Sequence, residues 1–332
     1  MSVRHVVLGG IAALGLLVTA ASDAQAACRY SKFATLPVQV TDTRLLIDGS
    51  INGKPQTMMI DSGSDTTWLP RKTAEDLTLK LSHSDRSTMG FGGESQMYTT
   101  LIQDMTIGKA RWEKINLYVI WDADFPYGAV IGANYLFQTD VEFALHDKEI
   151  RFFQPEGCDD AFLAYWDENA VAVPLIQVGQ IDLRPMVEVE INGKKLRALI
   201  DSGDPYTTID LAAAAALGVT PQSPGVVSAG KVGGVGKHAS EAWSAPFDSF
   251  AIGAEAINHP RIRMHDLYGS LYKDVEKLWV SEKVNGEPPV ILGADFLRAH
   301  RILVAASQHK VYLSYVGGPV FGKAPPAKAA SK

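Results

Sequence analysis

The sequence is poor in the side chains that hold metals and cofactors. Its 332 residues include only two cysteines, Cys28 and Cys158, and eight histidines, no two of which are spaced four residues apart. Two cysteines exclude a four-cysteine zinc or iron–sulfur site and a small scaffold built on several disulfides. The glycine-rich segment 90–93 lacks the lysine and the hydroxyl residue of a phosphate-binding loop. We therefore predict neither a metal site nor a cofactor.

The sequence also has no long basic run. Its 31 Lys and Arg are outnumbered by 37 Asp and Glu, which gives a formal net charge of -6. A protein that binds nucleic acid usually carries a positive patch or stripe, so we predict no nucleic-acid partner. With 46% hydrophobic residues, the chain can bury a sizeable core.

The only long apolar run lies at the N-terminus. Arg4 precedes about 16 mostly apolar residues, 6–21, and small residues follow at Ala24 and Ala26. This pattern predicts a signal peptide over 1–26, and therefore an exported protein that is periplasmic or secreted. A membrane anchor would need a run of roughly 20 residues. A lipoprotein signal ending at Cys28 is the other alternative. No later segment has the length and composition of a membrane span once the leader is removed.

Export determines how the two cysteines are interpreted. In an oxidising compartment Cys28 and Cys158 are expected to form a disulfide, whereas in the cytosol they would remain free thiols. Such a bond would join the mature N-terminus to a point 130 residues later. It predicts a structural boundary near residue 158.

The sequence contains an internal repeat. Residues 47–69 align without a gap with residues 187–209, and both copies contain Ile-Asn-Gly-Lys followed by Ile-Asp-Ser-Gly. A second match pairs 130–136 with 291–297, each an apolar pair before Gly. The two matches differ in offset by 21 residues, which predicts an insertion within 265–289 of the second copy.

Local patterns within the repeat predict β-structure. Apolar and polar residues alternate over 187–192, which is typical of a half-buried strand. Asn52-Gly53 and Asn192-Gly193 predict two-residue hairpin turns. Returning strands are expected at 56–60 and 196–200, further strands at 115–120, 149–153 and 310–315, and a short helix capped by Asp210 and stopped by Gly218. The expected fold class is all-β, with two homologous lobes.

Each copy places an aspartate at the end of a buried strand, before a hydroxyl residue and a glycine. This arrangement suits two carboxyl groups that face one another across a pseudo-twofold axis, because glycine permits a close backbone approach. Two such carboxyl groups cannot both ionise readily, so they share one proton. They can activate a water as general base and protonate a leaving amine as general acid. No metal and no covalent nucleophile are needed.

These residues resemble the aspartic peptidases of the retropepsin and pepsin type. Asp61-Ser62-Gly63-Ser64 and Thr67-Trp68-Leu69-Pro70 are similar to the first-lobe motif of pepsin-like enzymes, and the spacing to 130–132 and 291–293 is more similar to retropepsins. The resemblance implies an aspartic endopeptidase acting on a peptide or protein substrate, with a pseudo-twofold bilobal fold. It also implies roles for single residues: a catalytic pair, Asp61 and Asp201; supporting residues Ser62, Gly63, Ser64, Ser202 and Gly203; and flap candidates Gly92, Gly93, Tyr98, Gly233 and Gly234.

The resemblance predicts that one chain supplies both halves of one site. We expect a first lobe over 28–158, a connector over 159–178, a second lobe over 179–316 and a flexible tail over 317–332. The protein is then a monomer with an intramolecular pseudo-dimer. The alternative is that each lobe pairs with a lobe of another chain, which would make an obligate oligomer.

Asp204 departs from the family pattern, because a small or hydroxyl residue usually follows the second Asp-Ser-Gly. If its carboxylate points inward, it should disfavour ionisation of Asp201, which predicts that Asp61 is the more acidic member and Asp201 holds the shared proton. The alternative to an enzyme is a catalytically silent peptide-binding or assembly protein on the same fold.

Overall fold

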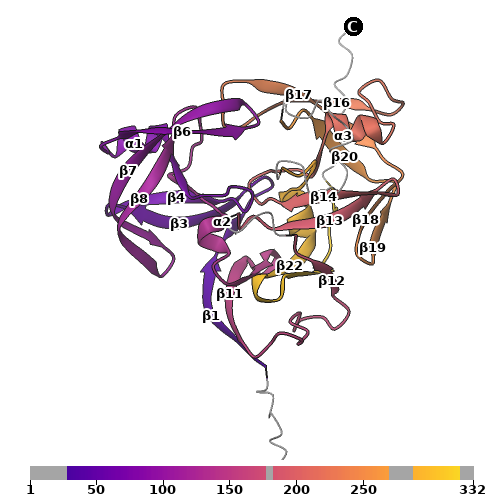
Figure 1. The fold of residues 1–332 in the computed structure, drawn as a ribbon, viewed down its shortest axis with the longest axis horizontal. Coiled ribbons are helices and arrows are strands. Elements are labelled where there is room, and N and C mark those ends of the chain that lie inside the picture. Colours follow the sequence, from indigo (N-terminus) through magenta and orange to yellow (C-terminus); the bar gives the residue numbers. More distant parts are fainter. Residues whose placement is uncertain (1–27, 177–181, 269–286, 322–332) are drawn as a thin grey trace, which may run out of the picture.

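The computed structural model describes residues 28–176, 182–268 and 287–321. The predicted leader, most of the predicted insertion and the last residues of the tail lie outside these ranges. The described chain is mostly β, with two barrel-like lobes that stand side by side above a shared sheet (Figure 1). Within these ranges no helix is long and apolar enough to cross a membrane.

The first lobe is an eight-stranded sheet that closes on itself through an additional pairing of β3 with β7. In sheet order its strands are β2 (Gln39–Val40), β3 (Leu45–Ile51), β4 (Lys54–Ile60), β9 (Ala129–Ile131), β5 (Trp68–Pro70), β8 (Ala110–Ile120), β7 (Gly93–Ile107) and β6 (Ser82–Gly90). Its short helices are α1 (Arg71–Asp76) and α2 (Ala133–Leu136).

The second lobe repeats this topology in a nine-stranded sheet. In sheet order its strands are β16 (Val227–Gly233), β17 (Ala239–Pro246), β20 (Arg261–His265), β15 (Thr208–Asp210), β21 (Val290–Leu292), β14 (Lys194–Ile200), β13 (Met186–Ile191), β18 (Ser249–Ile252) and β19 (Glu255–Asn258). Its helices are α3 (Leu211–Ala216) and α4 (Ala294–Ala299). The repeat predicted from the sequence is therefore a structural repeat.

A six-stranded sheet joins the lobes at the base of the molecule. Its order is β1 (Arg29–Pro37), β11 (Glu149–Glu156), β10 (Asp140–Ala144), β22 (His300–Ala305), β23 (Lys310–Tyr315) and β12 (Val171–Pro174), with 3-10 turns η1 (Leu145–Asp147) and η4 (Ala306–Gln308). β10 and β22 pair antiparallel at its centre. β12 comes from the segment expected to be a connector, so that segment contributes a strand to the shared sheet.

The hairpin turns and the helix cap were predicted correctly. Asn52 and Asn192 have φ of 48° and 49°, and each is followed by a glycine that also has positive φ. Asp210 caps α3 through a hydrogen bond that its side chain accepts from the Ala212 N–H, and Gly218, just beyond the helix, has φ of +80°. The disulfide between Cys28 and Cys158 is also present.

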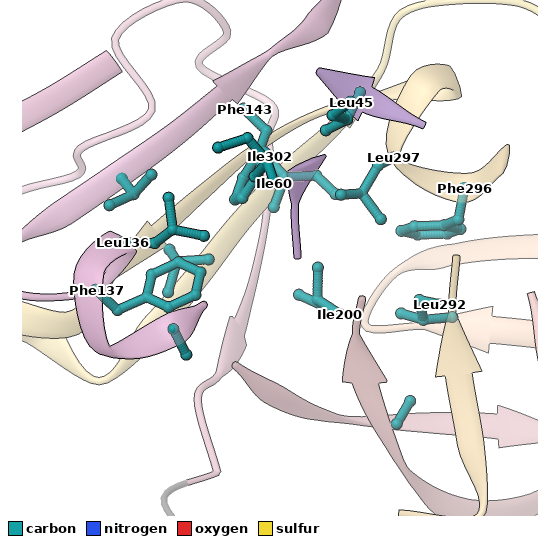
Figure 2. Packing of buried hydrophobic residues seen from close by; sticks show 14 of the residues in the cluster. Leu45, Ile60, Leu136, Phe137, Phe143, Ile200, Leu292, Phe296, Leu297 and Ile302 are labelled. Carbon is teal, nitrogen blue, oxygen red and sulfur yellow. The ribbon is translucent and has the colours of Figure 1, made fainter. Parts of the chain in front are cut away.

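The lobes share a continuous apolar core that runs through the shared sheet. Ile60 and Ile200, which end β4 and β14, meet side chains from α2, β10, α4 and β22 in this core (Figure 2). Phe143 on β10 and Ile302 on β22 are paired partners and fully buried. This packing fixes the ends of β4 and β14 relative to one another.

Candidate active site

Two aspartates meet where the lobes face each other. Asp61 follows β4 and Asp201 follows β14, and both strands lie inside their sheets beside a parallel neighbour. The Asp61 N–H donates to the Ile131 carbonyl at 3.0 Å, and the Asp201 N–H donates to the Leu292 carbonyl at 2.9 Å. The second motif of each repeat thus holds the backbone of the aspartate in that repeat.

The two loops are joined by a reciprocal serine contact. The Ser62 N–H donates to Ser202 Oγ at 3.0 Å, and the Ser202 N–H donates to Ser62 Oγ at 2.9 Å. Each hydroxyl then donates to the carbonyl that ends the opposite strand, at Ile200 and Ile60 respectively. Both serines are fully buried, so these bonds are shielded from water.

The glycines allow the carboxyl groups to approach the opposite loop. A Cβ atom on Gly63 would overlap the carboxyl carbon of Asp201, and a Cβ atom on Gly203 would overlap that of Asp61. No residue with a side chain fits at either position without displacing a carboxyl group. This explains why each aspartate is followed by Ser-Gly.

Each carboxyl group is held by backbone donors of its own loop. Asp61 Oδ1 accepts from the N–H groups of Gly63 and Ser64, both at 3.0 Å. Asp201 Oδ1 accepts from Gly203 at 2.7 Å and from Asp204 at 3.2 Å. Two carboxyl groups held this close cannot both ionise readily, which favours one shared proton between them.

Burial raises the pKa of both carboxyl groups. For Asp61 the negative charge of Asp201 raises the pKa further, well above its ordinary value. For Asp201 the burial effect is opposed by its backbone donors and by the positive charge of Arg184. Both carboxyl groups therefore have a raised pKa, and which of them holds the shared proton stays a prediction. Arg184 has no equivalent in the motif and no sequence signal identified it.

Arg184 lines the same cleft as the carboxyl pair and belongs to a partly buried ion-pair cluster. Its guanidinium group contacts Asp182 at 2.7 Å and Glu287 at 3.1 Å, and its side chain is 15% exposed. Burial raises the pKa of Asp65 in the same region, and the charge of Arg184 opposes that rise.

Asp204 points into the protein, as the sequence hypothesis required. Its Oδ1 accepts from the Tyr206 N–H at 3.0 Å, but its buried Oδ2 has no hydrogen-bond partner among the described residues. Burial and the charge of Asp201 raise the pKa of Asp204 to about 7. In the first lobe the equivalent Ser64 is satisfied, because it donates to the Thr66 carbonyl and accepts from Trp68 Nε1.

Two hairpins, one from each lobe, meet above the carboxyl pair. The β6–β7 hairpin of the first lobe and the β16–β17 hairpin of the second approach each other at the top of Figure 1. The Gly92 N–H donates to the Val235 carbonyl at 2.7 Å, and the His238 N–H donates to the Gly92 carbonyl at 2.9 Å. A Cβ atom on Gly92 or Gly236 would overlap the opposite tip.

The flap candidates all lie on these hairpins, but the side chain of Tyr98 does not line the cleft. Gly92 and Gly93 lie at the first tip, and Gly233 and Gly234 lie at the second. Tyr98 is on β7, but its ring packs against Trp121 and His83 and does not line the cleft. Its neighbour Met97 lines the cleft instead, because successive side chains of a strand point to opposite faces.

The hairpins and lobes enclose a cleft of about 680 Å³ with the two aspartates in its lining. A volume of this size accommodates several side chains of an extended peptide. Both lobes contribute apolar and charged residues to its lining. The apolar residues include Met59, Trp68, Met97, Ile120 and Phe125 from the first lobe and Leu199, Leu267 and Ile291 from the second. The charged residues besides the two aspartates are Arg44 and Asp65 from the first lobe and Arg184, Asp204, Lys231, Arg263 and Glu287 from the second.

Comparison with known proteins assigns the family. A family model described as aspartyl protease matches residues 47–135 and 187–296, which together cover more than half of the chain. The protein belongs to this aspartyl protease family, with one family unit in each lobe. No curated protein matches the sequence significantly.

A solved structure shows the same fold. The aspartic proteinase from Irpex lacteus superposes with a TM-score of 0.51 over 85% of this chain and 97% of that chain, at 13% sequence identity. The recognised bilobal fold is therefore confirmed, and at this identity the likeness concerns the fold alone.

Proposed function

We propose that the protein is an aspartic endopeptidase whose Asp61 and Asp201 activate water against a peptide bond. The observation that carries the proposal is the pair of facing carboxyl groups, held by symmetric loops in the lining of a peptide-sized cleft. Membership of the aspartyl protease family supports it.

The proposed chemistry divides two tasks between the carboxyl groups. The ionised carboxyl group of the pair takes a proton from a water molecule that attacks the carbonyl carbon of the substrate, and the charge of Arg184 helps to keep one group ionised. The protonated carboxyl group polarises the carbonyl oxygen by donating a hydrogen bond. As the tetrahedral intermediate breaks down, the C–N bond is cleaved, and the group that took the proton from water donates it to the leaving amine. The backbone donors to both carboxyl groups hold them in place throughout.

The test is cleavage of a mixed peptide library between pH 3 and 7. Products are identified by mass spectrometry for the wild type and for Asp61→Asn and Asp201→Asn, which preserve shape but remove the shared-proton chemistry. Cleavage by the wild type alone supports the proposal. Peptide binding by folded wild type without any turnover would instead support the silent peptide-binding protein.

We also propose that one chain forms the whole site and that the protein is exported. Both aspartates, both serines and both hairpins come from a single chain, which supports a monomer with an intramolecular pseudo-dimer. The disulfide supports folding in an oxidising compartment. Sedimentation of the purified protein and fractionation of cells that express the full chain test the two parts separately.

A further inference from the structure

The two lobes differ at positions that the repeat makes equivalent. In the first lobe β5 pairs in parallel with β8, and Trp68 lies opposite Tyr118. In the second lobe β15 pairs in parallel with β20, and Thr208 lies opposite Arg263. Trp68 and Thr208 occupy the same position of the sequence repeat. Arg263 therefore stands where the first lobe has a tyrosine.

Part of the first-lobe wall is an apolar surface. Trp68 packs edge-on against Phe125 with ring centroids 5.7 Å apart, and Met59, Met97 and Ile120 line the cleft with them. The Trp68 indole N–H is already satisfied by Ser64 Oγ. This half of the cleft suits a large apolar side chain, whose burial excludes water.

Arg263 gives the second-lobe wall a cation that is held in place but not neutralised. Its guanidinium group lies 4.5 Å from the centre of the Tyr206 ring and donates through Nη2 to the Ala229 carbonyl at 3.3 Å. Among the described residues no carboxylate lies within ion-pair distance of it. The ring and the carbonyl restrict its motion and leave other N–H donors available to a ligand.

The charged groups around Arg263 do not cancel this cation at acidic pH. Asp204 on the same wall is buried, and its pKa is raised to about 7, so it is mostly protonated at acidic pH. The lining carboxylate of Glu287 is paired with Arg184 at 3.1 Å. Lys231 on the overlying hairpin adds a further positive charge, and its exposed partner Glu241 lies 3.5 Å from it. An acidic side chain entering this half therefore meets a positive environment.

We propose that the second-lobe half of the cleft selects an acidic substrate side chain through Arg263, while the first-lobe half selects a large apolar one. The proposal rests on the proposed endopeptidase function. A guanidinium group recognises a carboxylate through two parallel hydrogen bonds, which an amide of the same shape cannot replace. The preferred bond then lies between an apolar and an acidic residue.

The test uses quenched fluorescent peptides in which phenylalanine adjoins the scissile bond on one side and Glu, Gln or Lys adjoins it on the other, in both orders. At pH 6, where a free Glu is ionised, the wild type should favour the Glu peptide over the Gln peptide by about tenfold in kcat/KM in one order. Arg263→Met should reduce this ratio to about one. Arg261→Met, two residues earlier on β20 and outside the cleft lining, should leave the ratio unchanged.

Two results would overturn the assignment: equal cleavage of the Glu and Gln peptides by the wild type, or a Glu preference that survives in Arg263→Met. If the wild type cleaves none of the peptides, the endopeptidase proposal fails, and the subsite is tested by binding. Fluorescence anisotropy on Asp61→Asn then decides it, because Glu-selective binding that depends on Arg263 supports the subsite and its absence overturns it.

Discussion

Ser62 Oγ lies 2.9 Å from the backbone nitrogen of Ser202, from which it accepts a hydrogen bond, and the Ser62 N–H in turn donates to Ser202 Oγ. The two lobes are thus joined by side chains at the point where the carboxyl groups meet. We expect Ser62→Ala to lower the free energy of unfolding by about 1–3 kcal/mol, because it leaves the buried Ser202 N–H without an acceptor. It should also lower kcat by loosening the carboxyl pair.

Denaturant unfolding and peptide cleavage measure these two effects. Ser50→Ala is the matched control, since Ser50 is half-buried, bonds only to the Thr106 hydroxyl at 2.8 Å and does not line the cleft. Equal losses in the two variants would contradict a special role for the interlobe contact.

The glycines of the two loops should be irreplaceable. Gly63→Ala would drive a methyl group into the Asp201 carboxyl group. Because a displacement of about 1 Å can reduce a rate by about 100-fold, we expect kcat/KM to fall by at least that factor. Ser50→Ala, outside the cleft lining, is the folding control. A Gly63→Ala enzyme with normal cleavage would show that the carboxyl groups do not need this approach.

Asp204 should make the protein less stable as the pH rises. Its folded-state pKa of about 7 exceeds its ordinary value, so its contribution to stability is complete below about pH 4 and is lost as the pH rises through 7. The Asn side chain of Asp204→Asn cannot ionise. The free energy of unfolding of this variant, relative to that of the wild type, should therefore rise by up to about 4 kcal/mol between pH 4 and pH 8. Denaturant titrations at both pH values test this, with the exposed Asp48→Asn as control. A constant difference between wild type and Asp204→Asn would contradict the burial of an ionisable Asp204.

Arg184 should set the acidic limit of activity. Its positive charge lowers the pKa of Asp201, so the singly ionised pair persists to lower pH than it otherwise would. In Arg184→Gln the acid limb of the profile of kcat/KM against pH should move to higher pH. Arg111→Gln, which removes an exposed arginine paired with Asp104, should leave the limb in place. An unchanged profile for Arg184→Gln would show that the charge of Arg184 does not affect the ionisation of Asp61 and Asp201.

The disulfide should stabilise the shared sheet. It closes a loop of 130 residues between the start of β1 and the end of β11. Replacing both Cys28 and Cys158 by serine should cost about 2–5 kcal/mol of unfolding free energy. Thermal unfolding of the variant, and of the wild type with and without a reducing agent, measures the loss. If reduction leaves the wild type unchanged while the double variant is destabilised, the cause lies in the serines and not in the bond.

The repeat made much of this fold predictable. Asn-Gly turns, apolar strands and the two Asp-Ser-Gly motifs have local signals, and the requirement that equivalent elements pair across an axis placed Asp61 beside Asp201. The strand order of the six-stranded sheet that joins the lobes could not be predicted from the sequence. β1 and β12 lie at opposite edges of the six-stranded sheet, and only long-range pairing decides their position.

Residues outside the motifs were less predictable for the same reason. Arg184 precedes Asp201 by 17 positions and reaches it through the packing of the chain that leads into β13. Its charge acts on Asp201, whereas the sequence argument considered only the neighbour in sequence, Asp204. The position of Tyr98 was misjudged by one residue, and in a strand one residue exchanges the two faces.

The pairing of β10 with β22 has the geometry of a symmetric dimer interface, in which a strand meets its own copy. In a homodimer every substitution occurs twice, so opposite walls of a shared site must remain alike. Fusion of two copies into one polypeptide removes that restriction. The replacement of Tyr118 by Arg263, and of Trp68 by Thr208, between equivalent positions is a divergence open only to a duplicated and covalently joined pair.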